Sequence, residues 1–360
     1  MNLIEPTLAT KWTRLVGVHH PVLQDGMGGG VLGTGRLAAA VSNTGALGSL
    51  STPGLSEDPV VLRRAMRAQV ELVLSQTDRP VAVNCPVGTT VEGGERPGAK
   101  VVLDVIFEIR RSDPAAERQL RVLTTSAGLP SPDLVKRAHD EGMVHQHKVG
   151  APRHAEKAVA NGVDAIIASG HEMGGHTLKT PISTMVLAPE VLCRVDVPVV
   201  VSGGLKDGAG LAAVLAMGAA AGGMGTRFLT SVENDWHERY IDQVVKSSVE
   251  DSILMPGVYG PCRYLKGKAT DELTRLIEDG ALTEVELMDW KAERARIAQR
   301  DGEVENGLTA AGMVAGFIDE RLPTRTIIER MVAEAGQLMS NATSLLVSKT
   351  GGTFSTTEAQ

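Results

Sequence analysis

The stretch PVVVSGGLKDGAGLAAVLAMGAAAGGMGTRFL, from Pro198 to Leu229, decides the fold prediction. It opens with a β-branched run, Val199–Ser202, passes through an Ala/Leu-rich segment typical of a helix, and returns to a short apolar run, Ala220–Met224. Two such runs joined by a helical segment are typical of a βαβ unit in a parallel sheet. The stretch therefore predicts two parallel strands with a helix between them.

The same alternation extends back to about residue 20 and gives eight units. Ser131-Pro132-Asp133 begins one helical segment with an N-cap, and Gly142, Gly162 and Gly218 stand where helix-ending glycines are expected. Eight units predict an α/β fold, a (β/α)8 TIM barrel. The expected strands are Pro21–Gln24, Ala46–Leu50, Val81–Cys85, Arg121–Thr125, Met143–Lys148, Ala165–Ser169, Val199–Ser202 and Ala220–Met224.

Beyond Glu233 the strand pattern stops, and charged helical segments follow. We expect residues 1–232 to form the barrel and residues 233–306 a helical cap, with helices at Thr270–Ile277 and Leu282–Gln299. An excursion between the third and fourth strands, over residues 88–113, contains a further expected helix, Val101–Arg110.

The C-terminal part, residues 307–347, is expected to pack back on the barrel, and residues 348–360 form a flexible polar tail. Its main helix is predicted over Thr324–Leu346. Apolar residues recur along one face of that helix, which predicts a buried face. They are Ile327, Ile328, Met331, Val332, Ala335 and Leu338.

Bulk composition excludes several classes of partner. The formal charge is −7 and no basic run occurs, so we expect no nucleic-acid partner. Three widely spaced cysteines indicate a reducing compartment rather than a disulfide framework. The first residues show no charged segment followed by an apolar one, so we expect no secretory leader, and no apolar stretch of about 18 residues occurs. We expect a cytoplasmic protein without a membrane partner that acts on a small molecule; whether it forms a homo-oligomer stays open.

Glycine clusters follow the last two predicted strands: Ser202-Gly203-Gly204 and Met224-Gly225-Thr226. Amides exposed by glycine turns, with the Thr226 hydroxyl, can surround a phosphate, and barrels often bind phosphate at these two strand ends. The glycines could also serve only to make tight turns. Because both clusters lie at the correct strand ends, phosphate binding is favoured.

Other strand ends suggest that the phosphate belongs to a flavin rather than to a sugar. The first strand runs into a glycine-rich turn that contains Met27 and lets backbone lie against a planar ring. Asn84 follows the third strand and can both donate and accept, and Lys148 ends the fifth with a cation suited to a ring carbonyl. Turn capping by Asn84 and a solvated position for Lys148 are the alternative interpretations.

The sixth strand leads into SGHEMGGH, residues Ser169 to His176, a loop that would project over the bound ring. An imidazole titrates near pH 6.5, so His176 could remove a proton from a carbon acid at neutral pH. His171 is a second candidate base. A structural or merely exposed histidine is the alternative.

Histidines also raise the possibility of a metal-dependent hydrolase, formed by His145 and His147 with the histidine loop. Strand alternation disfavours this, because His145 and His147 face outward if Lys148 points inward. No metal site is therefore expected.

At these residues the sequence resembles the nitronate monooxygenase family, whose relatives include NADH:quinone reductases and flavin-dependent enoyl-acyl-carrier-protein reductases. The likeness spans about residues 14 to 346. Asp25 departs from the family pattern, where a small residue is usual, and so does Met173. The matching segments are His20–Met27, Leu37–Leu50, His171–His176, Pro198–Ala219 and Gly223–Leu229.

The resemblance implies bound FMN and oxidation of an alkyl nitronate, by electron transfer to the flavin and then reaction with oxygen. His176 matches the catalytic histidine of the family. The expected cofactor-binding residues are Gly26, Met27, Gly28, Asn84, Lys148, Ser169, Gly175, Ser202, Gly203, Gly204, Met224, Gly225 and Thr226.

Two further functions stay open. In the first, NADH or NADPH reduces the FMN and a quinone or enoyl thioester accepts the electrons. The second is non-redox: a phosphate-binding barrel isomerase or lyase.

Overall fold

The computed structural model describes residues 8–27, 34–52, 58–88, 97–257 and 260–345. Its centre is an eight-stranded parallel sheet in the order β1-β9-β8-β6-β5-β4-β3-β2. A parallel bridge between Leu23 and Leu47 joins the two ends of the sheet, so the predicted (β/α)8 barrel is confirmed. The strands are β1 (Val22–Gln24), β2 (Gly48–Ser51), β3 (Val81–Pro86), β4 (Val122–Ser126), β5 (Val144–Val149), β6 (Ala165–Ser169), β8 (Val199–Ser202) and β9 (Ala221–Met224).

Alternation along the strands separates the barrel interior from the layer beneath the helices. Helix α1 (Lys11–Val16) brings Trp12 to the interior, where its indole N–H donates to Gln146 Oε1 at 3.1 Å. Every predicted strand is present, and no end differs from the prediction by more than two residues. Trp12 packs with the inward-facing Leu23, Leu47, Ala82, Val122, Ala165, Ile167, Val200 and Ala221.

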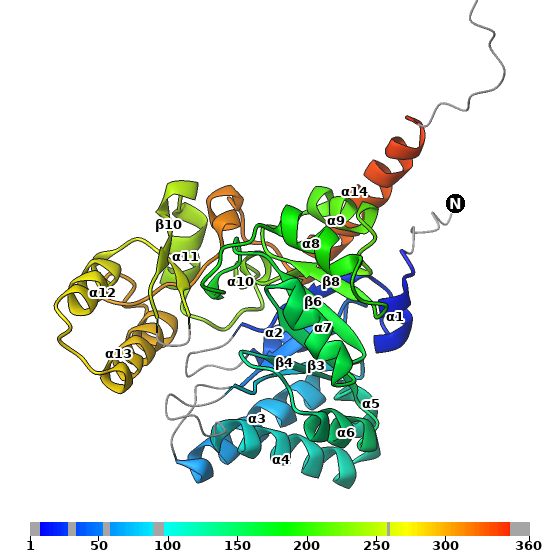
Figure 1. Ribbon diagram of the computed structural model, residues 1–360, viewed down its shortest axis with the longest axis horizontal. Helices are drawn as coiled ribbons and strands as arrows, with labels where there is room; N and C mark the ends of the chain where they lie inside the picture. Colours follow the sequence, from blue (N-terminus) through cyan, green and yellow to red (C-terminus); the bar gives the residue numbers. More distant parts are fainter. Residues whose placement is uncertain (1–7, 28–33, 53–57, 89–96, 258–259, 346–360) are drawn as a thin grey trace, which may run out of the picture.

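Helices cover the outside of the sheet (Figure 1). The predicted helix start at Ser131 is confirmed, because its hydroxyl accepts from the Leu134 amide at 3.2 Å. The predicted helix ends are confirmed by left-handed glycines: Gly142, Gly162 and Gly218 have φ of 71°, 98° and 102°. The covering helices are α2 (Gly35–Ser42), α3 (Pro59–Gln76), α4 (Pro97–Ser112), α5 (Pro114–Gln119), α6 (Pro132–Asp140), α7 (Pro152–Ala160), α8 (Thr184–Leu192) and α9 (Gly208–Ala216).

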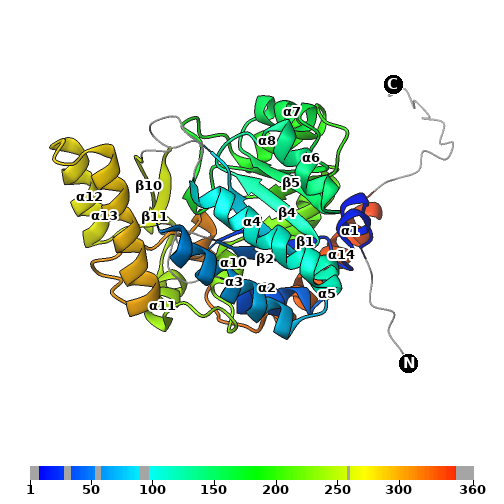
Figure 2. The ribbon, with the colours of Figure 1, turned by 90° about the horizontal axis from the view of Figure 1, so that it is seen from below.

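Beyond the barrel, the prediction that strands stop was wrong. Strands β10 (Ser252–Met255) and β11 (Cys262–Leu265) form an antiparallel pair, and β11 also pairs with β7 (Gly175–His176). Each strand has at most four residues, and the third comes from a loop far away in the sequence, so periodicity could not reveal the sheet. It lies between the barrel and helices α12 (Lys268–Glu278) and α13 (Glu284–Arg296) (Figure 2).

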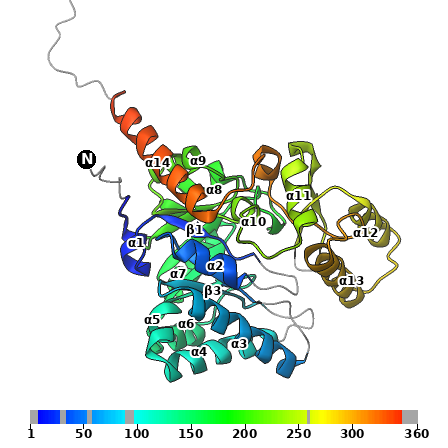
Figure 3. The ribbon, with the colours of Figure 1, turned by 180° about the vertical axis from the view of Figure 1, so that it is seen from behind.

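The C-terminal helix α14 (Thr324–Thr343) packs on α9, where the Gly208 amide donates to the Glu334 carboxylate at 2.8 Å. The predicted buried face is confirmed for all its members except Leu338, which is 40% exposed. Burial fails there because the end of α14 projects past the barrel, on the side away from α12 and α13 (Figures 1 and 3). The predicted tail lies outside the described residues.

Among the described residues, no helix combines the length and the apolar content needed to cross a lipid bilayer.

Candidate active site

A ring of polar side chains faces inward at the carboxyl ends of the barrel strands. Each member lies an even number of residues beyond an apolar interior residue of the same strand, so alternation points it into the barrel mouth. Parallel barrels bind their ligands at this end. The mouth ring consists of Asp25, Ser51, Asn84, Ser126, Lys148, Ser169 and Ser202.

One ion pair crosses the mouth ring. Lys148 Nζ lies 2.6 Å from Asp25 Oδ1, and the two side chains are 14% and 7% exposed. The Ser202 hydroxyl donates to Asp25 Oδ2 at 2.8 Å, and the Gly26 amide donates to Asp25 Oδ1 at 3.0 Å. The Asp25 carboxylate therefore joins the ends of β1, β5 and β8.

Two hydroxyl groups of the mouth ring, Ser51 Oγ and Ser169 Oγ, are buried without a hydrogen-bond partner in the described structure. Buried polar atoms normally have a partner, so these two mark positions where a bound ligand would complete the hydrogen bonding. Asn84 accepts weakly from the Ser126 hydroxyl, at 3.5 Å, and its amide packs against Gly26, where a Cβ would lie 2.6 Å from Asn84 Cγ.

The turn after β8 exposes backbone amides. Gly203 has φ of 98° and Gly204 φ of 78°, conformations that side chains rarely adopt. A Cβ at Gly203 would also lie 2.9 Å from the Gly170 carbonyl oxygen. Within the described part of the chain, the Gly203 and Gly204 amides donate no hydrogen bond. This turn has the donors and the open backbone that a phosphate requires.

The turn after β9 exposes further amides beside the turn after β8, and we call these two turns together the phosphate cradle. Gly225 precedes the short helix α10 (Thr226–Leu229), and neither the Gly225 nor the Thr226 amide has an acceptor among the described residues. The Thr226 hydroxyl accepts from the Gly312 amide at 2.9 Å, which leaves its own O–H to donate to a ligand. Met27 lies against the turn, 3.6 Å from where a Gly225 Cβ would be.

Two predicted cofactor-binding residues stand apart from this group. The Met224 side chain packs in the core outside the barrel, so a role at the mouth falls to its backbone. Gly28 lies outside the described residues.

The histidine loop is held on several sides before it reaches His176. The Glu172 carboxylate accepts from the Thr184 amide and hydroxyl, each at 3.0 Å, so it caps the start of α8. Its backbone oxygen accepts from the Met313 amide at 2.9 Å. The Arg263 guanidinium of β11 donates to the His171 carbonyl oxygen at 3.0 Å.

His176 itself lies in β7, paired with Cys262 of β11, and its side chain is exposed. The preceding Gly175 has φ of 73°, and no atom lies within 4 Å of the Cβ it lacks. The Thr177 amide extends the pairing by donating to the Pro261 carbonyl at 2.9 Å. The His176 imidazole therefore lies on a strand that pairs with β11 rather than on an unsupported loop.

The arrangement of histidines does not assemble the alternative metal site. His145 and His147 both bond the Thr125 hydroxyl, at 2.9 and 2.8 Å, on the outward face of the sheet, as alternation predicted. No cluster of three His, Cys, Asp or Glu side chains suited to a metal ion occurs among the described residues.

These two outward histidines make folding stability depend on pH. Burial lowers the pKa of His145 to about 3 and that of His147 to about 4. In the unfolded chain both imidazoles bind a proton near pH 6.5, whereas in the folded chain they stay neutral until the pH is much lower. Stability is thus fully present above pH 6.5 and falls as the pH drops towards 4, by up to about 1.4 kcal/mol per pH unit for each histidine.

Urea unfolding at pH 7.5 and pH 5.0 measures this loss. In His145→Gln and His147→Asn, an amide nitrogen or oxygen replaces the ring atom that faces Thr125, so both variants should lose less stability between the two pH values than the wild type. An equal loss in all three proteins would assign the pH dependence to other groups.

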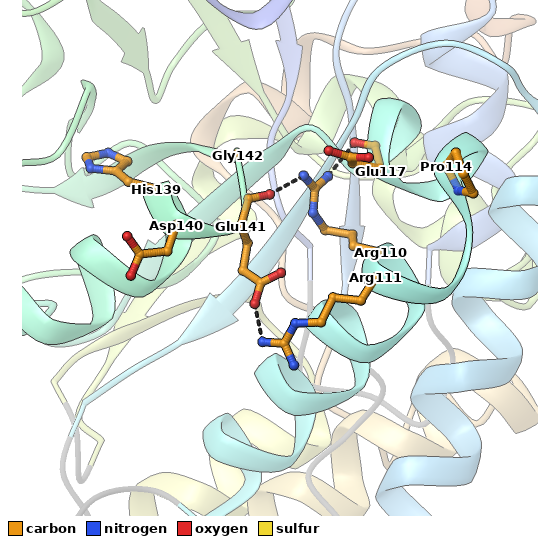
Figure 4. A pocket seen from close by; sticks show the side chains of 8 residues that line it. All are labelled: Arg110, Arg111, Pro114, Glu117, His139, Asp140, Glu141 and Gly142. Carbon is orange, nitrogen blue, oxygen red and sulfur yellow. Dashed lines mark hydrogen bonds and ion pairs between the residues drawn. The ribbon is translucent and has the colours of Figure 1, made fainter.

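A surface cleft of about 390 Å³ lies at the opposite end of the barrel, before β4 and β5 begin (Figure 4). Arg110, 3% exposed, spans it and donates to the carbonyl oxygens of Glu117, Leu120 and Glu141. A cation at the ends of α5 and α6 stabilises both helices, so we assign Arg110 a structural role.

Sequence reasoning missed several members of this site. Ser51 and Ser126 each lie one residue beyond a predicted strand end, so a longer strand would have included them in the inward alternation. Asp25 stood out as a departure from the family pattern but was not included among the site residues. Arg263 lies in the four-residue run CRYL, whose aromatic and apolar residues before a helix were a weak strand signal.

Comparison with known proteins agrees with this architecture. The family model described as nitronate monooxygenase matches residues 9–334. A (3aS,4S,5R,7aS)-5-hydroxy-7a-methyl-1-oxo-octahydro-1H-indene-4-carboxyl-CoA dehydrogenase of Rhodococcus jostii is 31% identical, over 91% of this chain and 96% of that protein. A probable nitronate monooxygenase of Staphylococcus saprophyticus is 28% identical, over 92% of this chain and 99% of that one.

Among solved structures, FabK from Thermotoga maritima superimposes with a TM-score of 0.81 and is 30% identical, covering 94% of this chain and 100% of that chain. The chain therefore belongs to the nitronate monooxygenase family and is a flavin-dependent oxidoreductase.

Proposed function

We propose that this protein binds FMN at the barrel mouth and transfers hydrogen between the flavin and a coenzyme A thioester, with His176 moving the proton. The observation that carries the substrate class is the identity of two relatives named as carboxyl-CoA dehydrogenases. They are 31% and 30% identical, over 91% and 94% of this chain. The probable nitronate monooxygenases compared with them are 25% to 28% identical.

The described residues fit a flavin mononucleotide. Four amides have no acceptor among the described residues, those of Gly203, Gly204, Gly225 and Thr226, and they would donate to the terminal phosphate. The polar part of the isoalloxazine ring would bond the unpartnered hydroxyls of Ser51 and Ser169, together with Asn84. These donors support FMN over a ligand without phosphate.

When bound, the flavin would supply two-electron acceptance or donation. His176 would take the proton from the carbon next to the thioester carbonyl, or return it in the reverse direction. A proton-transfer group within reach of substrate typically contributes about 10² to 10⁴ in rate. Glu172 and Arg263 hold the loop that carries this imidazole, and NADH or NADPH is the proposed reductant for turnover in the reductive direction.

Oxidation of an alkyl nitronate is the second candidate. The observation in its favour is the nitronate monooxygenase family model, which matches almost the whole described chain. A nitronate has already lost the proton that a thioester would give up, so with this substrate His176 would orient the anion rather than remove a proton.

Anaerobic flavin spectroscopy tests the proposal. We expect FMN-loaded protein to be bleached by NADH or NADPH and the colour to return on adding an enoyl-CoA, or to be bleached directly by a saturated acyl-CoA. Oxygen uptake with an alkyl nitronate, and no response to any thioester, would favour the second candidate. A purified protein that is colourless and takes up no FMN would contradict both and favour a non-redox barrel enzyme.

A further inference from the structure

We propose that Asp25 is an electrostatic counter-ion which cancels the charge of Lys148 beside the bound flavin and thereby lowers its reduction potential. This inference rests on the flavin-binding part of the proposed function. It assigns Asp25 a tuning role without direct participation in proton transfer.

The geometry puts a full ion pair inside the mouth ring. Lys148 Nζ and Asp25 Oδ1 are 2.6 Å apart, and both side chains are largely shielded from water. Of the seven residues of the mouth ring, Lys148 is the one cation and Asp25 the one carboxylate. The net charge that the ring presents to a ligand is therefore close to zero, and removing either partner changes it by one unit.

The Asp25 carboxylate is held in place by groups other than Lys148. Ser202 Oγ donates to Oδ2 at 2.8 Å and the Gly26 amide donates to Oδ1 at 3.0 Å. Ser202 lies at the end of β8 and Gly26 in the turn after β1, two segments that would line the flavin site. A carboxylate held by these two donors stays at the mouth even when Lys148 is replaced, so its charge acts at a constant position.

Charge close to a flavin changes its reduction potential, because it stabilises the oxidised and reduced forms to different extents. The reduced flavin carries more negative charge, so a nearby cation stabilises it and raises the potential. In a site shielded from water such an effect is weakly screened. With Asp25 at 2.6 Å, the Lys148 cation acts as part of a dipole, and its stabilisation of the reduced form is smaller.

A purely structural role is the competing explanation, because the pair also joins β1 to β5. The two explanations differ in what happens when both charges are removed. If the pair only joins the two strands, that link is lost in every variant and the variants should behave alike. If the pair acts through its charge, the flavin potential should follow the net charge of the ring. The order of potentials among the variants therefore separates them.

The experiment compares FMN-loaded wild type with Asp25→Asn, Lys148→Met and the double variant. Midpoint potentials are measured by equilibration with redox dyes at pH 7, and the dissociation constant of the flavin–sulfite adduct is measured by absorbance. Asparagine keeps the shape of Asp25. Its one carbonyl oxygen can accept from the Gly26 amide, and its amide nitrogen can donate to the Ser202 hydroxyl oxygen. Asp25→Ser is the second neutral variant, for use if Asp25→Asn does not fold.

We expect Asp25→Asn to have a more positive potential and to bind sulfite at least tenfold more tightly than wild type. Lys148→Met should shift both quantities in the opposite direction, and the double variant should return close to wild type. The matched control is Asp140→Asn, which breaks a Lys136–Asp140 pair of the same 2.6 Å length on α6, where both side chains are more than half exposed. It should change neither quantity.

Two results would overturn the assignment. In the first, the potential and the sulfite affinity are unchanged in both Asp25→Asn and Asp25→Ser. In the second, they shift in the same direction in Asp25→Asn and Lys148→Met. Failure of the wild-type apoprotein to bind FMN would overturn it together with the proposed function. The protein could also bind FMN normally and show the expected order of potentials, but turn over no thioester or nitronate. That result would support the Asp25 assignment and reject only the substrate class.

Discussion

Replacement of His176 by glutamine is expected to slow hydrogen transfer by about 10² to 10⁴ while FMN binding stays close to wild type. Glutamine preserves a polar side chain of similar length but cannot exchange a proton near neutral pH. The residue lies on β7, paired with Cys262 through backbone contacts that the substitution does not touch. Anaerobic single-turnover rates, followed at the flavin absorbance, measure the effect separately from product release.

The control for this variant is His139→Gln, which replaces an exposed histidine at the far end of the barrel. It should keep the wild-type rate. A rate loss below tenfold in His176→Gln would remove His176 from the proton-transfer role. If His171→Gln instead gave the large loss, the base would be the first histidine of the loop, whose Nδ1 lies 3.6 Å from the Glu172 carboxylate.

Gly203→Ala is expected to weaken FMN binding on the order of 100-fold, which corresponds to about 2.7 kcal/mol. The added Cβ would lie 2.9 Å from the Gly170 carbonyl oxygen and 3.0 Å from Thr184 Oγ1. The turn must shift to relieve this contact, and its shift moves the amides that would bind the phosphate. Fluorescence titration of the apoprotein with FMN measures the dissociation constant.

Gly218→Ala is the matched control. Gly218 has nearly the same backbone conformation as Gly203, φ of 102° against 98°, but no atom lies within 4 Å of its missing Cβ. Both variants should lose roughly 1 to 2 kcal/mol of stability from the left-handed backbone. Only Gly203→Ala should lose FMN. Equal affinities in the two variants would show that this turn does not hold the phosphate.

Much of the fold could be predicted because its determinants are local. The strand Val199–Ser202 follows from its β-branched residues, and the end of α9 at Ala216 follows from the left-handed glycine, Gly218, two residues later. The two glycine turns of the proposed phosphate site were predictable for the same reason, since each lies at the end of a predicted strand. Strand ends were off by one or two residues, which was enough to hide Ser51 and Ser126.

The three-stranded sheet that supports His176 was not predictable in this way. Its strands are too short to show a period, and 85 residues of the chain separate β7 from its partner β11. Hydrogen bonds between strands so far apart depend on where the barrel places the loop and where the cap returns, which no local pattern encodes.

The sequence by itself determined the eight βα units, the glycine turns after the last two strands and the presence of a histidine loop after the sixth. The tertiary structure alone decided that Asp25 meets Lys148 and Ser202, because closing the barrel brings three strand ends together around one buried carboxylate. Backbone conformation is governed by neighbours along the chain, whereas the charge of a site is governed by neighbours in space.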